Sequence, residues 1–217
     1  MAGVRSWFVG LSAALALVAV LAGCSGGSSG AVQRSVARTN RLAGLVTDPA
    51  PDVGSLSLPD ASQGGRDLPF VAQPGQVLLV YFGYTSCPDI CPTTLADLHH
   101  AIAGLPVADR GRVQMAMVTI DPARDTPAVL QAYLAHFFPS GHPLATTDQA
   151  RLAAAAAAFG ARYDVTVSTS GEESVGHSAL VYAVDRHGQV VDAWPFGVDS
   201  SVVINDLRIL LRRSGTA

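Results

Sequence analysis

Two cysteines carry the strongest chemical signal in this sequence. Cys87 and Cys91 lie four positions apart in YTSCPDICP, and a proline follows each of them. The motif comes directly after VLLVYFG, an apolar run typical of a strand that is covered on both faces. Two thiols at this spacing could form a stabilising disulfide, act as a redox couple, or bind a metal ion. The rest of the chain must separate these three chemistries.

The third cysteine of the sequence, Cys24, follows a hydrophobic N-terminal segment. Arg5 precedes an apolar run over residues 8–20, and the small residues LAG lead into Cys24. This pattern predicts a secretory signal peptide over residues 1–23, too short and too weakly flanked for a membrane-spanning helix; an uncleaved signal anchor is the alternative. LAGC resembles the lipobox of bacterial lipoproteins. The resemblance implies that Cys24 is lipidated and holds the exported protein at the outer face of the bacterial cytoplasmic membrane.

Composition divides the remaining chain into a stalk and a domain. Residues 24–53 are rich first in Gly and Ser and then in Ala, Arg and Pro, which predicts a flexible stalk. Residues 54–217 are long enough to bury one core as a single domain.

Charge and cysteine content exclude several classes of function. The formal net charge is −3, and no basic patch indicates nucleic acid as a partner. The sequence contains no lysine, which excludes Schiff-base chemistry. In an oxidising compartment a disulfide between Cys87 and Cys91 would close a very small loop and add little stability. The pair is therefore better explained by redox chemistry or metal binding than by a structural disulfide.

Periodicity predicts an α/β fold around the motif. After an N-terminal hairpin, strands and amphipathic helices alternate, and a second hairpin and a helix then close the chain. The predicted elements are a hairpin over 54–71, strands over 77–83, 112–120 and 163–167, helices over 92–105, 127–137 and 146–159, a hairpin over 178–196 and a helix over 199–213. This order is compatible with a thioredoxin-like fold, a central sheet with helices on both faces and an N-terminal hairpin. Sites in such sheets form beyond the carboxyl ends of the strands, where the cysteine motif lies.

The local sequence predicts activated thiols. We expect a tight turn over residues 88–91 and a helix that begins at Pro92, so that both sulfurs lie near a helix N-terminus, which favours thiolate over thiol. Asp89 is either a turn and cap residue or a group that favours a bound cation. A pair of thiolates selects for copper(I), zinc or an iron–sulfur centre, and copper(I) tolerates two or three soft ligands.

A third ligand would come from one of six histidines. His99 and His100 lie about 12 Å farther along the predicted helix, too far to share a metal with the cysteines. His177 lies in SVGHSALVYAVD, after a glycine-containing loop and just before a strand. The remaining three are predicted to be solvated at the surface: His136, His142 and His187. Spacing alone does not bring His177 to the cysteines.

Three blocks of the sequence resemble the Sco/SenC family. They are YFGYTSCPDICPTTLADL, VTIDPARDTPAVLQAYLAHF and VGHSALVYAVDRHGQVV, they occur in family order, and the resemblance covers residues 56–213. Members of that family are membrane-tethered thioredoxin-fold proteins that bind copper and serve assembly of the copper A centre of cytochrome c oxidase. The resemblance implies that Cys87, Cys91 and His177 bind copper(I) or copper(II), with Asp121 near the site or else a strand-end cap. It also implies an oxidase subunit as acceptor, with a copper donor protein and a thiol reductant protein as further partners.

The same cysteines also allow an enzyme. A thiol–disulfide oxidoreductase that reduces the cysteines of the oxidase subunit, or of another exported protein, would use the same two sulfurs. Three residues separate the cysteines, whereas ordinary thioredoxin-like redox motifs have two. VGHS also stands where thioredoxins resemble one another in having a cis-proline. Both features favour metal binding.

Overall fold

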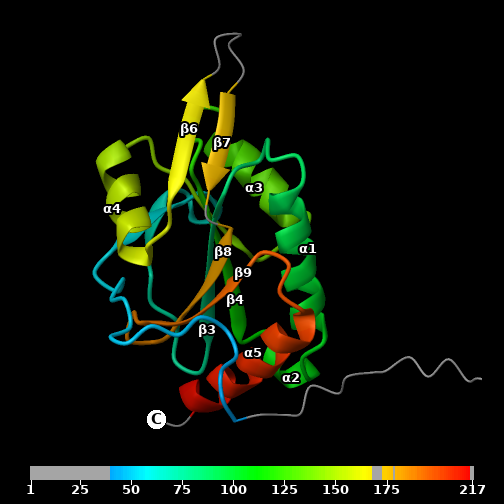
Figure 1. The fold of residues 1–217 in the computed structure, drawn as a ribbon. Coiled ribbons are helices and arrows are strands. Elements are labelled where there is room, and N and C mark those ends of the chain that lie inside the picture. Colours follow the sequence, from blue (N-terminus) through cyan, green and yellow to red (C-terminus); the bar gives the residue numbers. More distant parts are fainter. Residues whose placement is uncertain (1–39, 168–172, 178, 216–217) are drawn as a thin grey trace, which may run out of the picture. The chain divides into compact units, whose positions relative to one another are not determined.

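The computed structural model describes residues 40–167, 173–177 and 179–215, with the side chains of all of these except 164–167 and 173–177. Within this part of the chain, seven strands form one sheet in the order β2-β1-β5-β4-β3-β8-β9 (Figure 1). The strands are β1 (Ser57–Asp60), β2 (Arg66–Pro69), β3 (Val77–Gly83), β4 (Val113–Thr119), β5 (His142–Leu144), β8 (Leu180–Val184) and β9 (Val190–Pro195). β3 pairs in parallel with β4 and antiparallel with β8, so the strand that precedes the cysteine motif is internal to the sheet.

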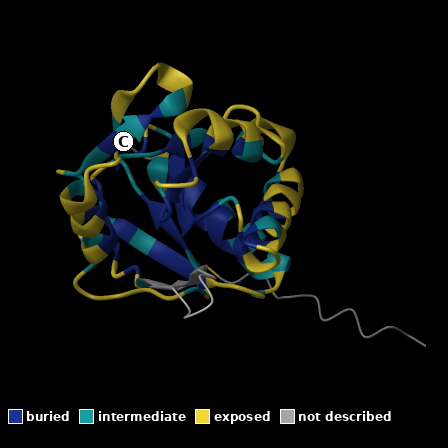
Figure 2. Cartoon of the chain, turned by 90° about the horizontal axis from the view of Figure 1, so that it is seen from above, coloured by how far each residue is buried: buried dark blue, intermediate teal, exposed yellow. Residues whose placement is uncertain are grey.

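Helices cover both faces of the sheet. In the described residues they are α1 (Ile90–Ala103), α2 (Val107–Arg110), α3 (Pro127–Ala135), α4 (Gln149–Phe159), α5 (Ser200–Ser214) and the short 3-10 helix η1 (Ala61–Gln63). Side chains alternate between the faces along a strand. On β3, the Tyr81 hydroxyl donates to Cys91 of α1, whereas the Phe82 ring lies 5.4 Å from the Phe159 ring of α4. α1 and α4 therefore pack on opposite faces, and the strands between them are buried (Figure 2). The predicted α/β fold is confirmed.

Helix caps explain where two of the helices begin. The Thr126 side chain accepts a hydrogen bond from the Val129 N–H at 3.3 Å, and Pro127 occupies the first helical position of α3. The Asp148 carboxylate accepts two backbone N–H groups at the start of α4. These caps fix the first residues of α3 and α4.

A second, two-stranded sheet lies between α4 and β8 in the sequence. It consists of β6 (Tyr163–Val167) and β7 (Glu173–His177), which pair antiparallel with Tyr163 opposite His177. The predicted strand over 163–167 is observed, whereas β7 was not predicted. This ribbon brings the chain to His177 shortly before β8 begins (Figure 1).

The segment before β1 runs along the outer strand β9. The Leu45 N–H donates to the Ala193 carbonyl at 2.7 Å, and the Val53 N–H donates to the Gly188 carbonyl at 2.8 Å. The Val53 side chain is fully buried. The packed domain therefore includes residues before Gly54, where its start was predicted. The predicted boundary between signal peptide and stalk lies outside the described residues.

Two buried aspartates anchor this segment. The Asp206 carboxylate accepts the N–H groups of Ala43 and Gly44 at 3.0–3.1 Å and the indole N–H of Trp194 at 3.1 Å. A Cβ atom at Gly44 would lie 2.1 Å from Asp192 Oδ1, so only glycine fits against that carboxyl group. Burial, and next the neighbouring Asp206, raise the pKa of Asp192 to about 7.

This pKa predicts how stability depends on pH. Because the folded-state pKa lies above the ordinary value of 3.8, the contribution of Asp192 is full below pH 4 and is lost as pH rises to about 7. Asp192→Asn should therefore gain stability over the wild type across this window, by at most about 4 kcal/mol, since one pKa unit corresponds to about 1.4 kcal/mol. Denaturant unfolding at pH 4 and pH 7 measures the difference, with the exposed Asp97→Asn as control. A wild-type-to-variant difference that is the same at both pH values would contradict this assignment.

Candidate metal centre

The cysteine motif occupies the loop after β3 and the first turn of α1. α1 begins at Ile90, two residues before the start predicted at Pro92. Pro92 is tolerated because N–H groups in the first turn have no partner within the helix. Asp89 precedes the helix, but its side chain makes no capping hydrogen bond. Cys91 therefore lies inside the helix and Cys87 in the turn before it.

The structure brings the two sulfurs together and buries them. Cys87 and Cys91 are both thiols, with exposed fractions of 8% and 0%. The Cys91 N–H donates to Cys87 Sγ at 3.3 Å, and the Tyr81 hydroxyl donates to Cys91 Sγ at 3.3 Å. A Cβ atom at Gly83 would lie 3.1 Å from Cys91 Sγ and 2.7 Å from Tyr81 Cε1. Glycine at the end of β3 thus lets the Cys91 sulfur approach the sheet.

The electrostatics of Cys91 differ from the prediction. Burial raises the pKa of the Cys91 thiol to about 12, although hydrogen bonds from the Tyr81 hydroxyl and the Tyr84 backbone act in the opposite direction. Cys91 is therefore a neutral thiol near pH 7, and the predicted thiolate at this position is wrong, because loss of hydration outweighs the helix N-terminus. A metal ion bound by both sulfurs must displace the Cys91 proton.

The position of His177 is described only for its backbone. β7 ends at His177 and β8 begins at Leu180. Val181 pairs antiparallel with Tyr81, so Leu180 lies toward the carboxyl end of β3, where the cysteine loop begins. The topology thus carries the chain at His177 to the same end of the sheet as the two thiols. The His177 side chain, and with it the predicted ligation, lies outside the described residues.

Asp121 lies in the loop after β4, where it interacts with Arg124 and Thr119. It is buried, its carboxylate pairs with Arg124, and its N–H donates to Thr119 Oγ1 at 3.0 Å. Burial, followed by the influence of Cys87, raises the pKa of Tyr84 to about 12, and Arg124 opposes this shift. Asp121 therefore pairs with Arg124, and Arg124 lowers the pKa of Tyr84, which also interacts electrostatically with Cys87.

Asp125 is the site residue that the sequence analysis missed. Its carboxylate is 1% exposed and accepts hydrogen bonds from the Thr85 N–H at 2.9 Å, the Thr85 hydroxyl, and the Thr119 hydroxyl at 2.7 Å. These bonds tie the start of the cysteine loop to the end of β4. The available signal was a second acidic residue in DPARDTP, but nothing in the sequence pairs it with a threonine 40 positions earlier.

The other histidines contact different parts of the chain. His99 Nδ1 lies 2.8 Å from the Phe137 carbonyl oxygen. His142 Nδ1 lies 2.8 Å from the carboxylate of the fully buried Asp60, so the prediction that His142 is solvated at the surface is wrong. Among the side chains that the structure describes, no three His, Cys, Asp or Glu residues form a cluster that could hold a metal ion.

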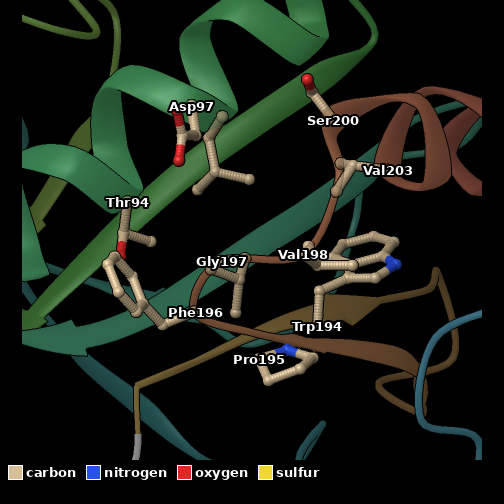
Figure 3. Close-up of a pocket in the computed structure, with 11 residues that line it drawn as sticks. Thr94, Asp97, Trp194, Pro195, Phe196, Gly197, Val198, Ser200 and Val203 are labelled. Atoms are coloured by element: carbon tan, nitrogen blue, oxygen red, sulfur yellow. The ribbon is translucent and has the colours of Figure 1, made fainter.

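A small cavity borders the site on α1. Thr94, one turn after Cys91, lines it together with Phe196 and Trp194 from the end of β9 and the loop after it. Figure 3 shows the Phe196 ring beside Thr94, with Trp194 from β9 farther along the cavity. Phe196 is 43% exposed, and Ile90, between the cysteines, is 37% exposed. Apolar side chains are thus accessible within one helical turn of Cys91.

The predicted lipid anchor, Cys24, lies outside the described residues. In residues 40–167, 173–177 and 179–215, no helix has both the length and the apolar character that a bilayer span requires.

Comparison with known proteins finds a family. A family model described as SCO1/SenC matches residues 61–212. Protein SCO2, mitochondrial, of Saccharomyces cerevisiae is 34% identical over 141 residues, which cover 62% of this chain and 45% of that protein. The chain thus spans less than half of this curated relative.

Two solved structures have a fold similar to that of this chain. Yeast Sco1 with copper bound has a TM-score of 0.63 and 30% identity, covering 75% of this chain and 90% of that one. Bradyrhizobium japonicum ScoI with copper bound has a TM-score of 0.61 and 28% identity, covering 71% and 96%. The family model spans the cysteine motif, the DPARDTP block and the GHS segment. This chain therefore belongs to the SCO1/SenC family.

Proposed function

We propose that this protein binds one copper ion through Cys87, Cys91 and His177 and delivers it to the copper A centre of cytochrome c oxidase. The observation that carries the proposal is the pair of adjacent buried thiols, joined by the hydrogen bond from the Cys91 N–H to Cys87 Sγ, in a SCO1/SenC fold. Similar proteins from yeast and Bradyrhizobium japonicum have been solved with copper bound.

The donor set fits copper better than it fits a structural zinc ion. Two sulfurs and one imidazole give three ligands, which copper(I) accepts, whereas structural zinc takes four. The imidazole would come from His177, whose backbone lies at the same end of the sheet as the thiols. Copper binding would displace the proton of Cys91, since burial raises the pKa of that thiol.

Redox state controls loading in this proposal. Two thiols can bind the metal, whereas a Cys87–Cys91 disulfide leaves neither sulfur able to coordinate as a thiolate. Oxidation removes two electrons and two protons from the pair and forms one S–S bond, and a disulfide of a partner protein accepts the electrons. A thiol reductant protein then restores the dithiol, and a copper donor protein supplies the metal.

A lipid on Cys24 would place this chemistry at the outer face of the bacterial cytoplasmic membrane. Tethering raises the effective concentration of the domain near a membrane-embedded acceptor. Cys87 is the more exposed of the two cysteines. The accessible Ile90 lies between them in the sequence, and the accessible Phe196 lines a cavity with Thr94, one turn after Cys91. We propose that the oxidase subunit approaches this face and takes copper by ligand exchange at Cys87.

Cells that lack this protein test the function. We expect them to make an oxidase that is deficient in copper A, measured from its near-infrared absorption and copper content. Wild-type protein should restore copper A, Cys87→Ser/Cys91→Ser should not, and excess copper should restore part of it. If a membrane-permeant thiol reductant restores copper A and excess copper does not, the protein is a thiol–disulfide oxidoreductase rather than a copper carrier.

A further inference from the structure

Tyr81 brings a hydroxyl group to the buried side of the thiol pair. It lies on the internal strand β3 and is 0% exposed. Its hydroxyl donates to Cys91 Sγ at 3.3 Å, and Gly83, two residues farther on, leaves the room for this approach. The hydroxyl therefore contacts the less accessible of the two cysteines.

The surroundings keep this hydroxyl a neutral donor. Burial, and next the proximity of Cys91, raise the pKa of Tyr81 far above its ordinary value, so that the phenol keeps its proton at any physiological pH. Because Cys91 is also fully buried, solvent does not compete for the bond. A hydrogen bond that solvent cannot reach contributes more to stability than an exposed one.

The bond distinguishes the reduced pair from the oxidised pair. A thiol or a metal-bound thiolate is a better acceptor than a disulfide sulfur, because it carries more negative charge. Forming the Cys87–Cys91 disulfide draws Cys91 Sγ toward Cys87 and makes it a weaker partner for the hydroxyl. Weakening this hydrogen bond raises the free energy of the disulfide form and leaves that of the dithiol form unchanged.

We propose that Tyr81 is a positioning residue that holds Cys91 Sγ through its hydroxyl and thereby shifts the thiol pair toward the reduced state that accepts copper. The inference rests on the proposed role of Cys87 and Cys91 as a redox-controlled site. In the oxidation concerned, the two thiols give two protons and two electrons to an external disulfide, which becomes a dithiol, and the protein gains one S–S bond.

The chain provides a matched control in Tyr133 of α3. Its hydroxyl is buried and has no hydrogen-bond partner among the described atoms. Burial raises its pKa first, and Cys91 and Cys87 raise it further, so this ring also lies within electrostatic range of the thiols. Tyr133→Phe therefore removes the same atom near the same sulfurs without removing a bond to Cys91.

The test is a redox equilibrium that needs no copper. Purified wild type, Tyr81→Phe and Tyr133→Phe are equilibrated without oxygen in mixtures of reduced and oxidised dithiothreitol, and the dithiol fraction is counted by alkylation and mass measurement. We expect Tyr81→Phe to shift the equilibrium about tenfold toward the disulfide, or about 30 mV for this two-electron couple. Tyr133→Phe should stay within about twofold of the wild type.

Two further readings complete the experiment. Unfolding of each reduced variant shows that the ring still packs, since phenylalanine fits the space of tyrosine. The copper(II)-loaded forms should show a thiolate-to-copper absorption band displaced only in Tyr81→Phe. A Tyr81→Phe equilibrium within twofold of the wild type, or equal shifts in both variants, overturns the role of the hydroxyl. Failure of the wild type to bind copper would instead overturn the proposed function and leave the redox result standing.

Discussion

Replacing His177 by alanine should lower the copper affinity of the reduced protein by at least a hundredfold. Residues that only support a ligand already contribute about 10–100-fold to metal affinity, and His177→Ala would remove a coordinate bond. Disulfide exchange depends on the sulfurs and needs no imidazole, so the dithiothreitol equilibrium should change by about twofold at most. Competition with a copper(I) chelator measures the affinity, and alkylation measures the redox equilibrium.

The exposed His187 at the turn between β8 and β9 provides the control. His187→Ala should keep both properties of the wild type. Copper affinity of His177→Ala equal to that of His187→Ala would remove His177 from the ligand set. In cells, His177→Ala should fail to support copper A formation, with partial rescue by added copper. Full support without added copper would favour the reductase function.

Changing Cys24 to alanine should move nearly all of the protein out of the membrane fraction. Lipidation requires the cysteine thiol, and the acyl chains supply the affinity for the bilayer in this account. Membrane fractionation and labelling with a radioactive fatty acid measure the effect. Cys87→Ser/Cys91→Ser is the matched control, because it removes thiols without touching Cys24 and should remain lipidated. Normal labelling of Cys24→Ala would show that the lipobox assignment is wrong.

Regular elements of the fold could be predicted because their signals are local. The uninterrupted apolar run VLLVYFG is β3, with the predicted bounds Val77–Gly83. Apolar residues at helical spacing mark α1, and Thr126 with Pro127 marks the start of α3. Strand β5 was missed because three residues, His142–Leu144, show no period. Its place in the sheet comes from pairing with β4 and β1.

The position of the cysteine motif could be predicted from the sequence, whereas the protonation of Cys91 and the hydrogen bonds around the motif could not. The cysteine spacing and its place after a buried strand are local features, so the motif lies where the sequence predicted it. The protonation of Cys91 depends on how deeply the fold buries one sulfur, and the Asp125–Thr85 bonds depend on residues 40 positions apart. The packing of residues 43–53 on β9 likewise depends on Gly44 meeting a buried aspartate. Long-range contacts of this kind leave no periodic signal in one sequence.

Copper titration of the purified protein without oxygen, followed by native mass measurement, tests the central claim most directly. Both sulfurs are needed to bind the metal, so the reduced protein should bind one copper ion per chain. The Cys87–Cys91 disulfide form should bind none under the same conditions. Equal copper binding by the oxidised and reduced forms would contradict the assignment of the two cysteines as ligands.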